Sequence, residues 1–182
     1  MAPILGIYAS QMSGHLVVPN SFESIATGVG TGSNTTINFN SIPQTYTHLQ
    51  IRGSYLSSTS TVVIPSYNGV RTGGTYAIHG LRANGSTASA YGLTGYDYWQ
   101  IGTATTSSPT MPEVFVIDIL DYTNTNKYKT TRWLAGNDFN GSGGIELGSV
   151  LWNNTAAITS ISFPIASGNF PTGSIISLYG VK

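Results

Sequence analysis

The chain has 182 residues, long enough for one domain with a sizeable core, and its seven basic and seven acidic side chains cancel in charge. Charged residues make up only 8% of the sequence, against about 25% in ordinary soluble domains. A neutral chain of this kind lacks the charge that attracts nucleic acids or anionic membranes, and without cysteine it has no disulfides or thiolate zinc sites. Low charge also gives little protection against association, so we expect partners to cover much of the surface.

Residues 1–20 form the first expected unit, an N-terminal arm. Four of its apolar residues have helical spacing: Ile4, Tyr8, Met12 and Leu16. Three others alternate as in a strand: Leu5, Ile7 and Ala9. We expect an extended arm that gains structure by contact, either with a partner or with this domain's own sheet. No basic segment precedes the apolar run, which is untypical of a signal peptide, so we expect the chain to stay in the cytoplasm of the cell that makes it.

From residue 21 to residue 182 the pattern predicts a single β domain. Three segments alternate apolar and polar side chains, which is typical of strands with one buried face: residues 35–39, 48–52 and 160–165. Residues 114–120 are apolar on both faces, which predicts a central strand covered on both sides. Other patterns predict further strands at residues 22–27, 61–64, 76–82, 96–101, 128–134, 145–152 and 174–181.

Turn signals separate these strands, among them Asn68-Gly69, Asn84-Gly85 and Asn140-Gly141. Residues 102–112 contain two prolines and are predicted to form a polar loop. About ten strands with this spacing indicate an all-β antiparallel sandwich or barrel. We favour a jelly-roll-like sandwich, because the strand count fits it and the C-terminal strand reads as buried.

The sequence offers little catalytic chemistry, since it contains no Gly-rich phosphate loop, zinc-protease motif or nucleophile elbow. Its three histidines lie far apart in the sequence: His15, His48 and His79. Asp118 interrupts an apolar strand, and we expect it to be structural: either buried in an ion pair with Arg52 or Arg132, or a carboxylate at the edge of the strand. Because acids are too sparse for the facing carboxylates of glycoside hydrolysis, we predict no enzyme, no catalytic residues and no cofactor.

One segment resembles half of a calcium-binding loop. Asp138, Asn140 and Ser142 place oxygen-bearing side chains at every second position. The glycine comes too early for an EF-hand and the closing glutamate has the wrong spacing. We therefore expect a polar turn here and no metal site.

Aromatic residues form the most interesting group. Tyr91, Tyr96, Tyr98 and Trp99 lie within nine residues, and Trp152 lies on a later predicted strand. Such residues serve sandwich cores, subunit interfaces and glycan-binding surfaces, and the sequence does not separate these three uses. Four of them are candidates for contact with a glycan or a partner: Tyr96, Tyr98, Trp99 and Trp152.

Both ends of the chain carry a family resemblance. The opening PILGIYASQMSGHL (residues 3–16) resembles the start of many tailed-bacteriophage virion proteins. The ending ITSISFPIASGNFPTGSIISLYGVK (residues 158–182) resembles their C-terminal pair of strands, which closes on Leu178, Tyr179, Gly180, Val181 and Lys182. Between these ends, TYTHLQIRGSYL (residues 45–56) loosely resembles the strand that follows in such proteins.

The resemblance implies a non-enzymatic structural protein of a phage particle, assembled in the bacterial cytoplasm. We expect a capsid decoration or cement protein that bridges neighbouring major capsid subunits, working as a homo-oligomer, with a trimer favoured. Its arm would supply apolar contacts through Ile4, Leu5, Ile7 and Tyr8. The alternative is a tail-fibre or receptor-binding module that recognises host surface glycans. Neither interpretation involves a nucleic acid, a membrane or a cofactor.

Overall fold

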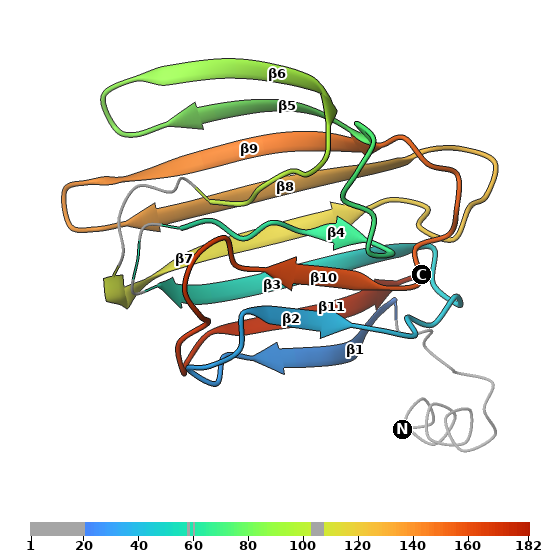
Figure 1. Cartoon of the computed structure of the whole chain (residues 1–182), viewed down its shortest axis with the longest axis horizontal. Coiled ribbons are helices and arrows are strands. Elements are labelled where there is room, and N and C mark those ends of the chain that lie inside the picture. The colour runs from blue at the N-terminus through green and yellow to red at the C-terminus, as the bar shows by residue number, and fades with distance from the viewer. Residues whose placement is uncertain (1–20, 58, 60, 103–107) are drawn as a thin grey trace, which may run out of the picture.

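A computed structural model describes residues 21–57, 59, 61–102 and 108–182, and these residues form an all-β antiparallel sandwich of two sheets (Figure 1). The larger sheet has eight strands in the order β1-β11-β3-β7-β8-β9-β5-β6, and the smaller has three in the order β2-β10-β4. The strands are β1 (Phe22–Val29), β2 (Thr36–Phe39), β3 (His48–Ser57), β4 (Ser66–Tyr67), β5 (Tyr76–Ala83), β6 (Ala88–Tyr96), β7 (Ser108–Ile119), β8 (Lys129–Asp138), β9 (Gly143–Trp152), β10 (Ile161–Pro164) and β11 (Ile175–Val181). None of the described residues forms a helix long and apolar enough to cross a membrane.

The strands near the two ends of the domain are nested in a jelly-roll-like manner. Successive strands β1 to β4 alternate between the two sheets, β11 lies between β1 and β3, and β10 lies between β2 and β4. This pairing is that of a ribbon of antiparallel strands rolled into two sheets. The predicted antiparallel sandwich is therefore confirmed. Beyond β7 the larger sheet continues through β8, β9, β5 and β6, and Figure 1 shows β5 and β6 extending past the smaller sheet.

Three predicted segments were wrong. The strand predicted at residues 61–64 is reduced to one bridge residue, Val63, and the short strand β4 follows it. Residues 108–112, predicted as loop, begin the long strand β7 despite two prolines.

Residues 97–101, predicted as a strand, contain none; the strand in this region is β6, which lies earlier, ends at Tyr96 and is rich in small residues. After it, Ile101 forms only an isolated bridge with Val63. Strand β6 is at the edge of the sheet and pairs only with β5. This pairing keeps β6 extended although its residues have a low intrinsic preference for strands.

Large rings fill the space between the sheets. Phe163 of β10 stacks on Phe115 of β7, with ring centroids 6.3 Å apart, and joins the two layers. Trp133 of β8 contacts Trp99 at 5.3 Å between ring centroids. All four side chains are buried, so the core is built from aromatic contacts as well as from the aliphatic residues of both sheets.

The opposite face of the larger sheet differs from the prediction. Val114 and Val116 of β7 point to this outer face and are exposed, so the expectation that both faces of this strand are covered was wrong for the described part of the chain. A strand with apolar residues on both faces is suited to being covered on both sides. The pattern does not show whether the same chain supplies both covering layers.

Asp118 does not form the buried ion pair that was one of its two predicted roles, because it is half-buried on the outer face and not in the core. Gln50 donates a hydrogen bond to its Oδ1 at 2.8 Å, and Arg52 donates one to the Gln50 amide oxygen at 2.9 Å. Arg132 is the register partner of Asp118, but no ion pair joins them among the described residues. The expected buried ion pair is therefore replaced by a chain of hydrogen bonds that passes through Gln50.

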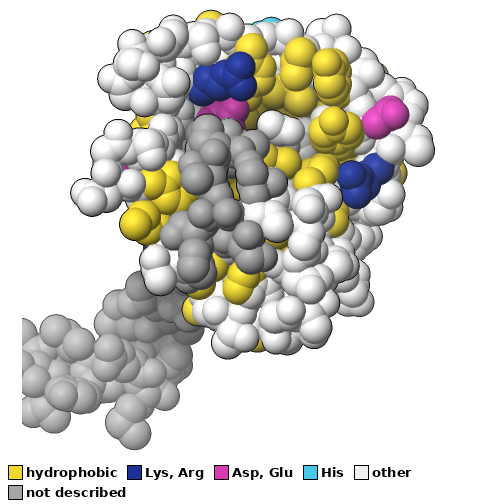
Figure 2. All heavy atoms as spheres, turned by 60° about the vertical axis from the view of Figure 1, so that its left-hand side comes forward, with side chains coloured by type: hydrophobic (Ala, Val, Ile, Leu, Met, Phe, Trp, Pro, Cys, Tyr) yellow, Lys and Arg dark blue, Asp and Glu magenta, His cyan; other side chains and the backbone are white. Residues whose placement is uncertain are grey.

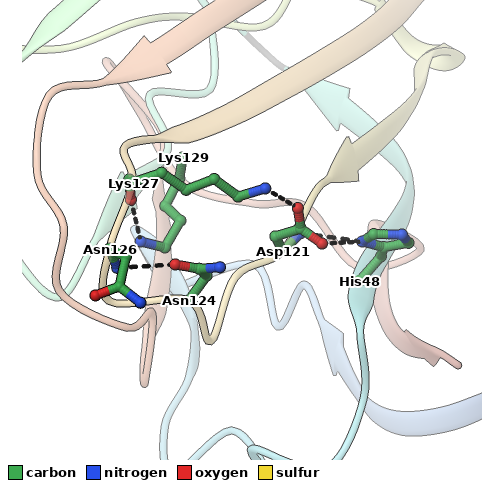
Figure 3. A network of polar contacts seen from close by, with 6 residues as sticks. All are labelled: His48, Asp121, Asn124, Asn126, Lys127 and Lys129. Carbon is green, nitrogen blue, oxygen red and sulfur yellow. Dashed lines mark hydrogen bonds and ion pairs between the residues drawn. The ribbon is translucent and has the colours of Figure 1, made fainter.

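A polar network holds the turn between β7 and β8 (Figure 3). The backbone N–H of Asp121 donates to His48 Nδ1 at 3.0 Å, which ties the turn to β3. Lys127 donates to the Asp121 carboxylate, and this bond holds the pKa of that carboxyl below its ordinary value. The buried Lys129 donates to the carbonyls of Lys127 and Thr155 at 2.9 and 3.0 Å. Burial lowers the pKa of Lys129, so these carbonyls stabilise a charge that is costly to bury.

Candidate functional site

The structure separates the four candidate contact aromatics into two pairs. Tyr96 and Tyr98 are 40% and 41% exposed, and their rings meet edge to face at 6.5 Å between centroids. Trp99 and Trp152 are 1% and 0% exposed. The candidate interface residues of the arm, Ile4, Leu5, Ile7 and Tyr8, lie outside the described residues.

The two tryptophans belong to the core. Trp152 ends β9 on its inner face, and its ring lies 5.6 Å from that of Tyr67. Trp99 packs between Tyr67 and Trp133. Neither indole presents a face at the surface, so only the two tyrosines are available to contact a ligand.

Two adjoining hollows lie on the inner side of β5 and β6, and we name them together the β5–β6 cleft. They share three lining residues, which are Arg82, Gln100 and Glu146. The first, with a volume of about 240 Å³, is largely aromatic and is otherwise lined by Ile78, Tyr91, Leu93, Tyr96, Tyr98 and Trp99. The second, of about 310 Å³, has small and polar walls: Ala83, Asn84, Thr87, Ser89, Gly102, Gly143 and Gly144. In Figure 2, hydrophobic side chains gather on the upper part of the molecule, the region that holds β5 and β6 in Figure 1.

Glu146 lies at the junction of the two hollows and is only 4% exposed. Its Oε1 accepts a hydrogen bond from the Tyr91 hydroxyl, whereas its Oε2 has no hydrogen-bond partner among the described residues. Burial raises the pKa of Glu146, although Tyr91, the nearby indole N–H of Trp133 and the charge of Arg82 oppose the shift. The Trp133 N–H lies close to the carboxylate without meeting hydrogen-bond geometry. Because Oε2 is itself shielded from solvent, the carboxylate holds Tyr91 in place and does not present a free acceptor at the surface.

Arg82 belongs to the same group of residues around Glu146. It is the register partner of Glu146 across β5 and β9, and its guanidinium lies 5.5 Å above the centre of the Tyr91 ring. Among the described residues, Arg82 forms no ion pair. The Tyr91 ring supports its guanidinium by a cation–π contact, and its N–H donors remain available in the cleft. Sequence reasoning missed Arg82, Gln100 and Glu146. The register of β5 on β9 brings Arg82 beside Glu146, and Gln100 comes from the segment after β6.

A second buried glutamate, Glu113, is enclosed by its neighbours. Asn137 donates to its Oε2 at 2.9 Å, and Gly144 in turn donates to the Asn137 amide oxygen at 2.9 Å. A Cβ added to Gly102 would lie 3.1 Å from Glu113 Oε2 and 2.6 Å from the Tyr55 hydroxyl, so the chain at Gly102 passes directly over both groups. Burial is the main reason that the pKa of the Tyr55 hydroxyl lies well above its ordinary value. The charges of Glu113 and Glu146 raise this pKa further. This arrangement leaves no room for a substrate between Glu113 and Gly102.

Six exposed apolar residues on the outer face of the larger sheet form what we call the outer patch: Leu81, Val114, Val116, Leu134, Ile145 and Leu147. Their exposed fractions run from 37% for Val116 to 58% for Leu81. Val116, Leu134, Leu147 and Leu81 are consecutive register partners on β7, β8, β9 and β5, so they form one unbroken row across four strands.

A hollow interrupts the outer patch beside this row. Gly136 is the register partner of both Val114 and Ile145, and it supplies no side chain between them. The resulting depression has a volume of about 610 Å³ and is lined in part by Val114, Leu134 and Ile145. The double-sided apolar pattern of β7 was the one sequence signal for this surface.

The segment that resembles half of a calcium loop is the turn between β8 and β9. The backbone N–H of Asn140 donates to Asp138 Oδ1 at 2.9 Å, and the N–H of Phe139 donates to the Ser142 carbonyl at 2.8 Å. The Asp138 carboxylate thus accepts a hydrogen bond from within its own turn. Within the described residues, no group of three or more His, Cys, Asp or Glu side chains could hold a metal ion.

Comparison of the chain with protein-family models, curated proteins and solved structures finds no match.

Proposed function

We propose that the chain is a non-enzymatic structural protein that works as a subunit of a larger assembly, and that the outer patch is the contact surface between copies of the chain. The observation that carries the proposal is the unbroken row of Val116, Leu134, Leu147 and Leu81 on a sheet face that no other described segment covers. Monomeric soluble proteins rarely expose contiguous apolar surface of this kind.

The chemistry of the outer patch favours a second copy as its occupant. All six residues are uncharged aliphatics, and charged residues are only 8% of the chain, so two copies bring little like-charge repulsion to the contact. The hollow above Gly136 offers a place for a protruding side chain such as Leu81 or Leu147 of another copy. Burying these side chains removes apolar area from water at about 25 cal/mol per Å² before the cost of association.

The resemblance of the chain ends to tailed-bacteriophage virion proteins suggests the assembly. We propose a capsid decoration or cement role, as a homo-oligomer, with a trimer favoured, seated on major capsid subunits after synthesis in the bacterial cytoplasm. Residues Ile4, Leu5, Ile7 and Tyr8 would supply the apolar contact to the shell.

The enclosed position of Glu113 supports the non-enzymatic part of the proposal. Glycoside hydrolysis in a sandwich needs two carboxylates that reach one substrate bond. Asn137 engages one oxygen of Glu113 and Gly102 covers it, so Glu113 does not share an open site with Glu146.

The location of the chain in purified particles tests this function. Mass spectrometry of particles, followed by cryo-electron microscopy, is expected to show copies of the chain on the icosahedral shell in groups that bury the outer patch. Absence of the chain from purified particles would overturn the proposal. Copies found only on the tail or its fibres would favour the alternative function, a receptor-binding module, which is supported by the exposed Tyr96 and Tyr98 beside a cleft.

A further inference from the structure

The β5–β6 cleft combines an aromatic hollow with a polar one around three shared side chains. The two volumes, about 240 and 310 Å³, are of the order of small-ligand pockets, and ligand pockets pair apolar and aromatic walls with a few placed polar groups. This cleft lies on the inner side of the sheet and shares no residue with the outer patch. An inference from the cleft therefore does not depend on the assembly role proposed above.

The aromatic hollow offers flat surfaces that suit the C–H faces of a ring. Tyr96 and Tyr98 are exposed, stand edge to face, and bring two ring planes of different orientation to one hollow. Tyr91 is fixed behind them by its bond to Glu146 and by the overlying guanidinium of Arg82. The Tyr91 ring, held in this way, loses little conformational freedom when a ligand binds.

The polar groups at the junction provide both donors and an acceptor. Arg82 is exposed and has N–H donors without an ion-pair partner among the described residues, and the exposed Gln100 supplies an amide oxygen as acceptor. A hydroxyl group donates one hydrogen bond and accepts others, so a polyol can engage both residues at once. The Gln100 amide also has N–H donors, and Asn84, Thr87 and Ser89 continue the polar lining into the second hollow.

We propose that the β5–β6 cleft binds a carbohydrate, with one sugar ring against Tyr96 and Tyr98, its hydroxyls toward Arg82 and Gln100, and a second sugar unit in the polar hollow. This gives the alternative function, glycan recognition, a site whose exposed rings are Tyr96 and Tyr98 and not the buried Trp99 or Trp152. An oligosaccharide fits better than an apolar ligand, because the exposed guanidinium of Arg82 would lose solvation beside an apolar group without gaining a partner.

Glycan binding by the isolated full-length chain tests the proposal. The probe is an array of bacterial O-antigen and capsular oligosaccharides together with neutral oligosaccharides, and the strongest hit is then titrated by calorimetry. We expect Tyr98→Ala and Arg82→Gln each to weaken binding by about tenfold or more, with the far-ultraviolet circular dichroism unchanged.

Matched controls exist for both variants. Tyr128 is 49% exposed on the turn between β7 and β8, and Arg132 is exposed on the outer face, so Tyr128→Ala and Arg132→Gln are expected to leave affinity unchanged. Failure to bind any glycan on the array would overturn the proposal, as would binding that survives both cleft variants. Because none of these variants alters the outer patch, either result leaves the test of the assembly role intact.

Discussion

The indole ring of Trp133 lies flat over Gly148, its register partner on the neighbouring strand β9. A Cβ added to Gly148 would lie 2.2 Å from the ring atom Cη2. Two other register pairs repeat this arrangement, with Phe115 over Gly53 and Tyr91 over Gly80. The large rings of this sheet therefore lie across neighbouring strands, because glycine leaves them the space.

This close approach predicts a large effect of a single methyl group. Gly148→Ala is expected to lower the free energy of unfolding by about 1–3 kcal/mol, because the indole must move within a packed core. Urea denaturation measures the change. The control is Ser149→Ala on the adjacent, half-buried outer-face position, which we expect to stay within about 0.5 kcal/mol of the wild type. A Gly148→Ala variant as stable as this control would contradict the predicted clash.

The outer patch predicts a change in association without a change in folding. Leu147 is 53% exposed, so Leu147→Lys removes little packing in the isolated chain but places a charge in the middle of the apolar row. We expect the variant to shift toward the monomer, as measured by size-exclusion chromatography with light scattering, while its far-ultraviolet circular dichroism is unchanged.

A matched control for Leu147 lies on another strand of the same sheet. Val29 of β1 is 54% exposed but is not in the outer patch, so Val29→Lys is expected to keep the wild-type assembly state. A wild-type chain that remains monomeric at high concentration would remove the outer patch as a self-contact surface.

Glu146 predicts a pH dependence of stability. Burial raises its folded-state pKa above the ordinary value of 4.5. The folded chain therefore binds more protons than the unfolded chain in the interval between these two pKa values, and the free energy of unfolding falls as pH rises through it. Glu146→Gln keeps an acceptor for Tyr91 but does not titrate. Relative to this variant, the wild type should lose stability from about pH 4.5 upward, as measured by urea denaturation at a series of pH values. A difference that does not vary with pH would contradict the raised pKa.

Lys129 is predicted to stabilise the turn that it anchors. Lys129→Met keeps the length of the buried side chain but removes the donors to the carbonyls of Lys127 and Thr155. We expect a loss of about 2 kcal/mol in the free energy of unfolding, since hydrogen bonds from a charged group are among the stronger ones. Lys127→Met is the control, because Lys127 is largely exposed and its pairing with Asp121 is a surface ion pair, which contributes little. Equal effects of the two substitutions would contradict an anchoring role for Lys129.

The arm is predicted to serve assembly rather than folding. Deletion of residues 1–12 is expected to leave the β-sheet circular dichroism and the Tm unchanged, because the sandwich begins at Phe22. The same deletion should reduce loading of the protein onto particles. Full loading of the truncated chain would show that Ile4, Leu5, Ile7 and Tyr8 are not the anchor.

The sequence by itself determined that this is an antiparallel β sandwich and where most of its strands lie. Alternation of apolar and polar residues is a local property, and wherever it was regular, as around Ile51 and Phe163, it located a strand and its buried face. It failed at β6, whose small residues carry no such pattern.

Only the tertiary structure decided which apolar and aromatic side chains are accessible. Val116 is exposed because the smaller sheet covers only one face of β7, and Trp152 is buried because Tyr67 of that smaller sheet packs on it. Tyr98 and Trp99 are neighbours in the sequence, but Tyr98 is exposed and Trp99 is buried. The cleft likewise depends on strand register, which brings Arg82 beside Glu146. Burial and register come from contacts between distant segments, and a local sequence pattern does not specify those contacts.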